Sequence, residues 1–119
     1  MPVSPRRALW IDGACGLCGA GVHLGVAAAG GLGVAPDVWR ITAVVSVLYA
    51  AVAWASTRSP RAGLTRMIWL NRGWVVVCVV LAAAVGTGLS RALFGGEAVV
   101  VGALSVWEAR VRARSDQTG

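Results

Sequence analysis

Three long stretches without a formally charged residue constrain this chain more than any other feature. They cover residues 13–36, 41–57 and 73–90, with lengths of 24, 17 and 18 residues. An α-helix needs about 20 predominantly apolar residues to cross the hydrocarbon core of a bilayer, with a range of roughly 17–25. Each stretch is therefore long enough for one membrane-spanning helix.

The composition also predicts that lipid is the solvent. Of the 119 residues, 57% are hydrophobic and only 13% are charged, and the mean hydropathy is +0.72. Soluble domains carry about 25% charged residues. The net charge of +6 comes from arginines that separate the apolar stretches and form no stripe with interleaved aromatic residues. We therefore expect a lipid bilayer as the partner and no nucleic acid.

A fourth apolar stretch, residues 92–107, is weaker because Glu97 interrupts it. It can still span the membrane if Glu97 sits at the interface and Glu108 snorkels or finds a partner. The alternative is three spans and a surface helix.

The arginines favour four spans. In that arrangement one side of the membrane carries eight of them: Arg6, Arg7, Arg58, Arg61, Arg66, Arg110, Arg112 and Arg114. The other side carries Arg40 and Arg91, and Arg72 is set aside as intramembrane. Because loops rich in arginine stay in the cytoplasm, we expect both termini and the middle loop there.

The predicted fold is an all-α membrane protein, a four-transmembrane-helix bundle in the bacterial cytoplasmic (inner) membrane. Residues 1–119 form one domain, with spans at about 8–34, 38–56, 64–88 and 92–109 and a basic polar tail over 110–119. Asp37 is a candidate N-cap of the second helix, and Pro60 ends one helix or begins the next. We expect the aromatic residues near span ends to lie in the headgroup layer; they are Trp39, Trp54, Trp69, Trp74 and Trp107, with Tyr49.

Polar residues in the first span share a face with glycines. On a helix Asp12, Gly16, Gly19 and His23 form one narrow stripe. This stripe should face protein, because unsatisfied polar groups are costly in hydrocarbon. Gly21 and Gly25 offer a second close-packing face, either within the bundle or in a dimer.

Five polar residues are predicted to meet at the cytoplasmic mouth of the bundle. They are Asp12, Arg66, Asn71, Arg72 and Glu108, and we expect the two carboxylates to pair with Arg72 or Arg66. His23 falls near mid-membrane, roughly level with Cys78. It is a candidate proton relay or ligand, or a hydrogen-bonded packing histidine.

The segment IDGACGLC (residues 11–18) resembles the opening of the DCC-type thiol–disulfide oxidoreductases, and the resemblance covers about fifteen residues. It implies an apolar strand, a turn at Asp12 and Gly13, and a helix in a thioredoxin-like fold. Cys15 would then be the attacking thiolate and Cys18 the resolving thiol. The alternatives are two small residues packing in a membrane helix, or metal ligation by Cys15, Cys18 and His23 with Cys78.

Over its whole length the chain resembles a loose group of small four-span bacterial membrane proteins. The residues concerned are Leu9, Trp10 and Asp12 in the first helix and Asn71 and Trp74 in the third. The resemblance implies no particular activity.

No nucleotide-binding loop, catalytic triad or paired-carboxylate motif occurs, so we expect neither an enzyme nor a bound cofactor or metal. The predicted role is a membrane component that packs with itself or with a partner protein. One alternative is a membrane thiol–disulfide oxidoreductase that uses Cys15 and Cys18. Another is a small oligomeric transporter or proton-conducting subunit, which requires a polar cavity from the Asp12 cluster towards His23.

Overall fold

The computed structural model describes residues 2–85 and 87–119. In chain order they form α1 (Pro5–Ala28), a 3-10 turn (Gly31–Gly33), α2 (Pro36–Ala55), a second 3-10 turn (Ser56–Arg58), α3 (Pro60–Ala84) and α4 (Gly88–Thr118). All four long helices are apolar and long enough to cross a membrane. The predicted all-helical architecture with four such helices is confirmed.

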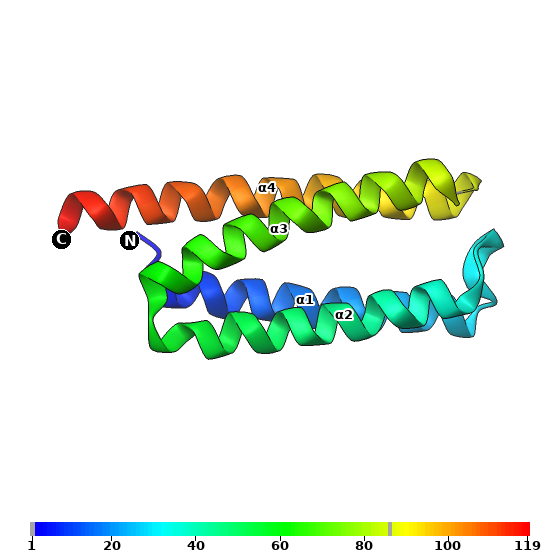
Figure 1. Ribbon diagram of the computed structural model, residues 1–119, viewed down its shortest axis with the longest axis horizontal. Helices are drawn as coiled ribbons and strands as arrows, with labels where there is room; N and C mark the ends of the chain where they lie inside the picture. Colours follow the sequence, from blue (N-terminus) through cyan, green and yellow to red (C-terminus); the bar gives the residue numbers. More distant parts are fainter. Residues whose placement is uncertain (1, 86) are drawn as a thin grey trace.

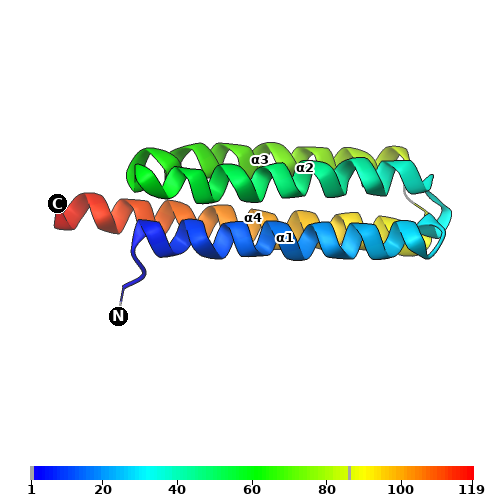
Figure 2. The same ribbon diagram turned by 90° about the horizontal axis from the view of Figure 1, so that it is seen from below.

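The helices form two antiparallel hairpins that lie along one another (Figures 1 and 2). α1 packs mainly against α2, and α3 packs mainly against α4. The bundle measures 49 × 22 × 21 Å. Figure 1 shows both termini at the same end of the bundle as the α2–α3 connection, and we call this the terminal end. The α1–α2 and α3–α4 connections lie at the opposite end, the loop end.

Proline and hydroxyl side chains set the starts of the helices. Pro5, Pro36 and Pro60 each occupy the first turn of a helix, where the missing N–H costs no hydrogen bond. Pro60 therefore begins α3. α4 starts with a reciprocal capping box between Thr87 and Ser90.

Asp37 is not the N-cap of α2, contrary to the prediction. The cap is Ala35, because the fixed φ of Pro36 suits the first residue of a helix. The helix therefore begins at Pro36, one residue before Asp37. Asp37 lies in the first turn, where its negative charge interacts favourably with the helix dipole. Its Oδ1 also forms an ion pair with Arg40 Nη1 at 2.7 Å.

α1 ends at Ala28, before the predicted span end at residue 34. Gly30, Gly31 and Gly33 have φ of 92°, 83° and 83°, and Leu32 between them has φ of 50°. These left-handed conformations suit glycine and cannot continue a right-handed helix. The chain therefore reverses within a tight glycine turn.

α4 is continuous through Glu97 and runs to Thr118. It packs along α3 and is not the separate surface helix of the three-span alternative. The predicted basic tail forms the last turns of this helix.

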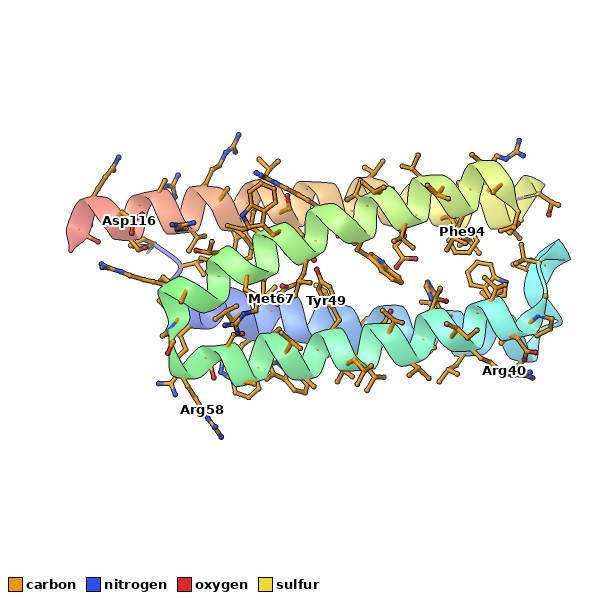
Figure 3. All side chains as sticks on the ribbon, viewed as in Figure 1. Arg40, Tyr49, Arg58, Met67, Phe94 and Asp116 are labelled. Carbon is orange, nitrogen blue, oxygen red and sulfur yellow. The ribbon has the colours of Figure 1, made fainter. Side chains whose placement is uncertain are left out.

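Apolar clusters fill both ends of the bundle. The terminal cluster consists of Ala8, Leu9, Ala53, Leu64, Met67, Ile68 and Val111. The loop-end cluster consists of Ala27, Val34, Trp39 and Phe94, with the Trp39 and Phe94 rings stacked at 4.4 Å between centroids. In Figure 3 the labelled Met67 and Phe94 point into the bundle, whereas Arg40 and Arg58 point away from it.

Candidate functional site

A buried hydrogen-bond network joins all four helices near the terminal end. We call it the carboxyl network; it consists of Asp12 of α1, Tyr49 of α2, Asn71 of α3 and Glu108 of α4. Asn71 Nδ2 donates to Asp12 Oδ2 at 3.3 Å and to Glu108 Oε2 at 2.8 Å. The Tyr49 hydroxyl donates to Asn71 Oδ1 at 2.6 Å, and Figure 3 shows Tyr49 pointing into the bundle. Asn71 is therefore the centre of the network.

The two carboxyl groups of this network are held by one amide, because Asp12 and Glu108 both accept a hydrogen bond from Asn71 Nδ2. Glu108 Oε1 is buried and has no hydrogen-bond partner among the described residues. Two acidic groups from α1 and α4 thus lie close together in the interior, and one of their oxygens is unpartnered.

The predicted ion pairs with Arg66 and Arg72 do not form. Arg66 donates to the Ser56 hydroxyl at 3.1 Å, and the Arg72 guanidinium lies over the Trp69 ring, 5.1 Å from its centroid. Since Asn71 points inward, Arg72, one position further along α3, faces outward. Within residues 2–85 and 87–119, no ion pair joins Asp12 or Glu108 to an arginine.

A second network, the histidine network, lies towards the loop end and again takes one residue from each helix. It consists of His23 of α1, Thr42 of α2, Trp74 of α3 and Glu97 of α4. His23 Nδ1 lies 2.7 Å from Thr42 Oγ1, and His23 Nε2 lies 2.7 Å from Glu97 Oε2. The Trp74 indole donates to Glu97 Oε1 at 2.8 Å.

Both ring nitrogens of His23 have a partner in this network. The Thr42 hydroxyl also lies 2.9 Å from Trp39 O and 3.0 Å from Val38 O, so it links the His23 ring to the backbone of α2. The imidazole is therefore fixed from two sides, by α2 and by α4.

Glu97, Trp39 and Trp74 therefore lie inside the bundle, where we had expected the membrane interface. Glu97 is only 20% exposed and binds His23, while Trp39 is buried and donates to Gly31 O at 2.8 Å. The physical reason is that the Glu97 oxygens and the indole nitrogens of Trp39 and Trp74 find partners on another helix or in the α1–α2 turn, so burial leaves none of them unpaired.

A cavity of about 430 Å³ lies between the two networks. Its polar lining includes Asp12, Asn71, Tyr49 and Ser46 towards the terminal end and His23, Trp74 and Glu97 towards the loop end. On α1 the networks are eleven residues apart, which corresponds to about 16 Å of helix. The cavity spans the depths of Asp12 and His23, but its wall is mostly apolar, whereas the transporter alternative requires a polar cavity.

The cavity reaches the side of the bundle, mainly along α1 and α4. Its lining includes exposed residues of both helices, namely Cys15, Cys18 and Val22 of α1 and Ala92, Gly96 and Val100 of α4, and the lining residue Val45 of α2 is exposed as well. The terminal and loop-end clusters lie beyond the two networks. Access from the side is therefore more open than access along the bundle axis.

Cys15 and Cys18 lie in the middle of α1 as free thiols, and both line the cavity. Residues 10–13 are helical, so the strand and turn that the oxidoreductase resemblance implies are not formed. Cys78 is free and buried on α3. Within the described part of the chain no group of three or more His, Cys, Asp or Glu is placed to hold a metal ion.

The predicted packing glycines divide into three kinds. Gly16 lies in a close α1–α2 contact, where an added Cβ would be 3.2 Å from Ser46 O. Gly19 lines the cavity, and Gly21 and Gly25 have open space beside them. Sequence reasoning missed Gly13, where an added Cβ would collide with the Trp54 indole.

Sequence reasoning also missed the partners of His23 and of Asn71. One feature of the sequence could have predicted the His23–Glu97 pair. Asp12 and His23 are eleven residues apart on α1, and Glu97 and Glu108 are eleven residues apart on α4. On antiparallel helices, equal spacing lets both pairs meet at the same two depths. Tyr49 and Thr42 carry no comparable signal.

No protein-family model matches this chain, and neither the curated proteins nor the solved structures include one with significant similarity to it.

Proposed function

We propose that this chain is a multi-pass protein of the bacterial cytoplasmic membrane that binds a small molecule from the lipid phase inside its helical bundle. The single observation that carries the proposal is the cavity of about 430 Å³, which all four helices line and to which α1 and α4 contribute most residues. Small-molecule sites are typically 300–1,000 Å³, apolar, and equipped with a few polar groups.

The membrane assignment is supported by the outer surface. Large apolar side chains are exposed on the helices, including Val44, Leu48, Val76 and Val99 at 59%, 61%, 62% and 72%. A soluble monomer rarely exposes so continuous an apolar surface. The arginine distribution supports both termini in the cytoplasm.

Binding from the lipid is better supported than conduction through the bundle. A conducting path would have to pass the terminal cluster and the loop-end cluster, where Trp39 and Phe94 stack closely. The lateral opening between α1 and α4 instead faces the region where the hydrocarbon would lie. The polar groups at the two cavity ends would orient a ligand that entered there.

Photolabelling tests this proposal. The protein is reconstituted in lipid nanodiscs with a trifluoromethyl-phenyldiazirine, a small neutral apolar reagent, and its adducts are mapped by peptide mass spectrometry. We expect adducts in residues 15–22 and 96–104, in addition to the outward residues 76–80.

Gly19→Leu places a side chain in the cavity and should reduce the cavity adducts several-fold. Gly73→Leu is the matched control, because Gly73 is exposed, has open space beside it and does not line the cavity. Equal cavity labelling in the wild type and in Gly19→Leu would contradict the proposal.

A second candidate function, packing against another copy or a partner protein, is favoured by Gly21 and Gly25. Both are exposed and have open space beside them, so the bundle does not use this face itself. Small residues allow close helix approach in membranes. Cross-linking in native membranes tests this candidate: Gly21→Leu with Gly25→Leu should abolish a dimer that Gly73→Leu preserves.

A further inference from the structure

The interior of the bundle contains more acid than base. Asp12, Glu97 and Glu108 provide three carboxyl groups; the basic His23 pairs with Glu97, and the neutral Asn71 amide donates to the other two. Four arginines contact other groups, at the surface or at the bundle ends: Arg40, Arg61, Arg66 and Arg72. This interior acidity contrasts with the net charge of +6 for the whole chain.

Glu97 has His23 as a basic partner, whereas within the described residues no ion pair joins a basic group to Asp12 or Glu108, which we call the carboxyl pair. Glu108 Oε1 is buried without a hydrogen-bond partner in the same part of the chain, and Asp12 lines the cavity. A buried carboxyl group without a basic partner is costly to ionise, so a positive ligand in the cavity would compensate its charge and be favoured.

The walls of the cavity fit an organic cation. Tyr49 and Trp74 line it together with Trp39, and aromatic faces attract cations within about 6 Å. Most of the other lining residues are valine, leucine and glycine. Inorganic Ca²⁺ or Mg²⁺ needs about six or more oxygen ligands, which this lining does not supply.

From these observations we infer that the cavity binds a monovalent, lipophilic organic cation, with its charge near Asp12 and its apolar body against the valines of α1 and α4. The inference rests on the proposed function, since it names the class of ligand for that cavity. The ligand enters from the bilayer between α1 and α4 and neutralises the charge of the carboxyl pair.

Competition against the diazirine reagent tests the inference. Tetraphenylphosphonium is a membrane-permeant organic cation, and tetraphenylborate is an anion of nearly the same size and shape. We expect tetraphenylphosphonium to suppress the adducts at residues 15–22 and 96–104 saturably, while tetraphenylborate does not. Adducts at the outward residues 76–80 should be unaffected by either ion.

A second experiment replaces the two carboxyl groups of Asp12 and Glu108 with amides, which cannot carry a negative charge but still form hydrogen bonds. The double variant Asp12→Asn with Glu108→Gln should weaken competition by tetraphenylphosphonium at least about tenfold, a change of about 1.4 kcal/mol or more in binding free energy. Persistent cavity adducts without competitor show that this variant still folds. The matched control is Asp37→Asn with Asp116→Asn, which removes two exposed carboxylates and should leave competition unchanged.

The outcomes separate this inference from the proposed function. If cavity adducts form but the two ions compete equally, or neither competes, the cation inference is overturned and the cavity remains a binding site. If the wild type gives no cavity adducts, both fail. If the double variant folds and still binds tetraphenylphosphonium as tightly as the wild type, the carboxyl pair is not the binding charge.

Discussion

At the scale of single residues, Asn71 does more than any other side chain to hold the polar interior together. Its amide donates to Asp12 and Glu108 and accepts from Tyr49, so one residue satisfies groups from the other three helices. Without it, two buried carboxyl groups would lose the amide donor that they share. A buried polar network is stabilising only when its members are satisfied.

Asn71→Ala should therefore lower the free energy of unfolding by on the order of 3 kcal/mol, because it leaves buried carboxyl oxygens unpaired. Tyr49→Phe removes one hydrogen bond from the same network and should cost about 1 kcal/mol. Unfolding of both variants in mixed detergent–SDS micelles measures the difference. If the two variants lose equal stability, Asn71 is not the centre of the network.

Gly13 is important for packing because it has no side chain. An added Cβ there would collide with the Trp54 indole, whereas one at Gly21 would meet open space. Gly13→Ala should destabilise the α1–α2 hairpin by about 1–3 kcal/mol through overpacking. Gly21→Ala should be neutral or slightly stabilising, since alanine favours helices more than glycine does. The thermal unfolding midpoints compare the two, and equal midpoints would rule out the Gly13–Trp54 contact.

At the scale of elements, the α1–α2 connection depends on a side chain of the helix that follows it. The turn at residues 30–33 holds four left-handed residues, and Trp39 of α2 donates its indole hydrogen to Gly31 O at 2.8 Å. The Trp39 ring also stacks on Phe94 of α4 and meets the His23 ring edge-on at 5.3 Å between centroids. One tryptophan thus links the turn to the loop-end cluster.

Trp39→Phe keeps an aromatic ring but removes the indole donor from the Gly31 carbonyl, which still accepts from Val34 N at 3.0 Å. We expect a loss of about 1–3 kcal/mol and faster hydrogen exchange confined to the turn. Trp69→Phe is the control, because Trp69 is 66% exposed and its change should stay within about 0.5 kcal/mol. Unchanged exchange at residues 30–34 in Trp39→Phe would contradict this role.

At the scale of the whole molecule, the end of the bundle that holds both termini is also the end that holds most of the arginines. Both termini and the α2–α3 connection lie at the terminal end, which carries most of the arginines (Figure 1). Insertion with this end in the cytoplasm agrees with the excess of positive charge expected there.

Alkaline phosphatase, which is active only outside the cytoplasm, tests this orientation. Fusions after Ser59 and after Gly119 should be inactive, and fusions after Gly33 and after Gly88 should be active. The reverse pattern would invert the topology. Activity after Gly119 together with inactivity after Ser59 would instead indicate an odd number of spans.

Several features of the fold could be predicted from sequence because they are local. The uncharged stretches determine which segments form long apolar helices, and Pro60 marks the start of one of them. The shared stripe of Asp12 and His23 follows from helical periodicity alone, and both residues are buried. Where local signals competed, as at Asp37 and in the glycine turn, the exact helix ends could not be predicted.

Thus the amino-acid sequence by itself determined four apolar helices, the sites of their turns and the inward face of α1, because helix length and periodicity depend on neighbouring residues. Only the tertiary structure decided that His23 pairs with Glu97, that Asn71 stands between two carboxyl groups and that Arg66 and Arg72 bind elsewhere. These contacts, and the cavity between them, depend on how each helix is rotated against the other three. That rotation is set by packing across the whole bundle.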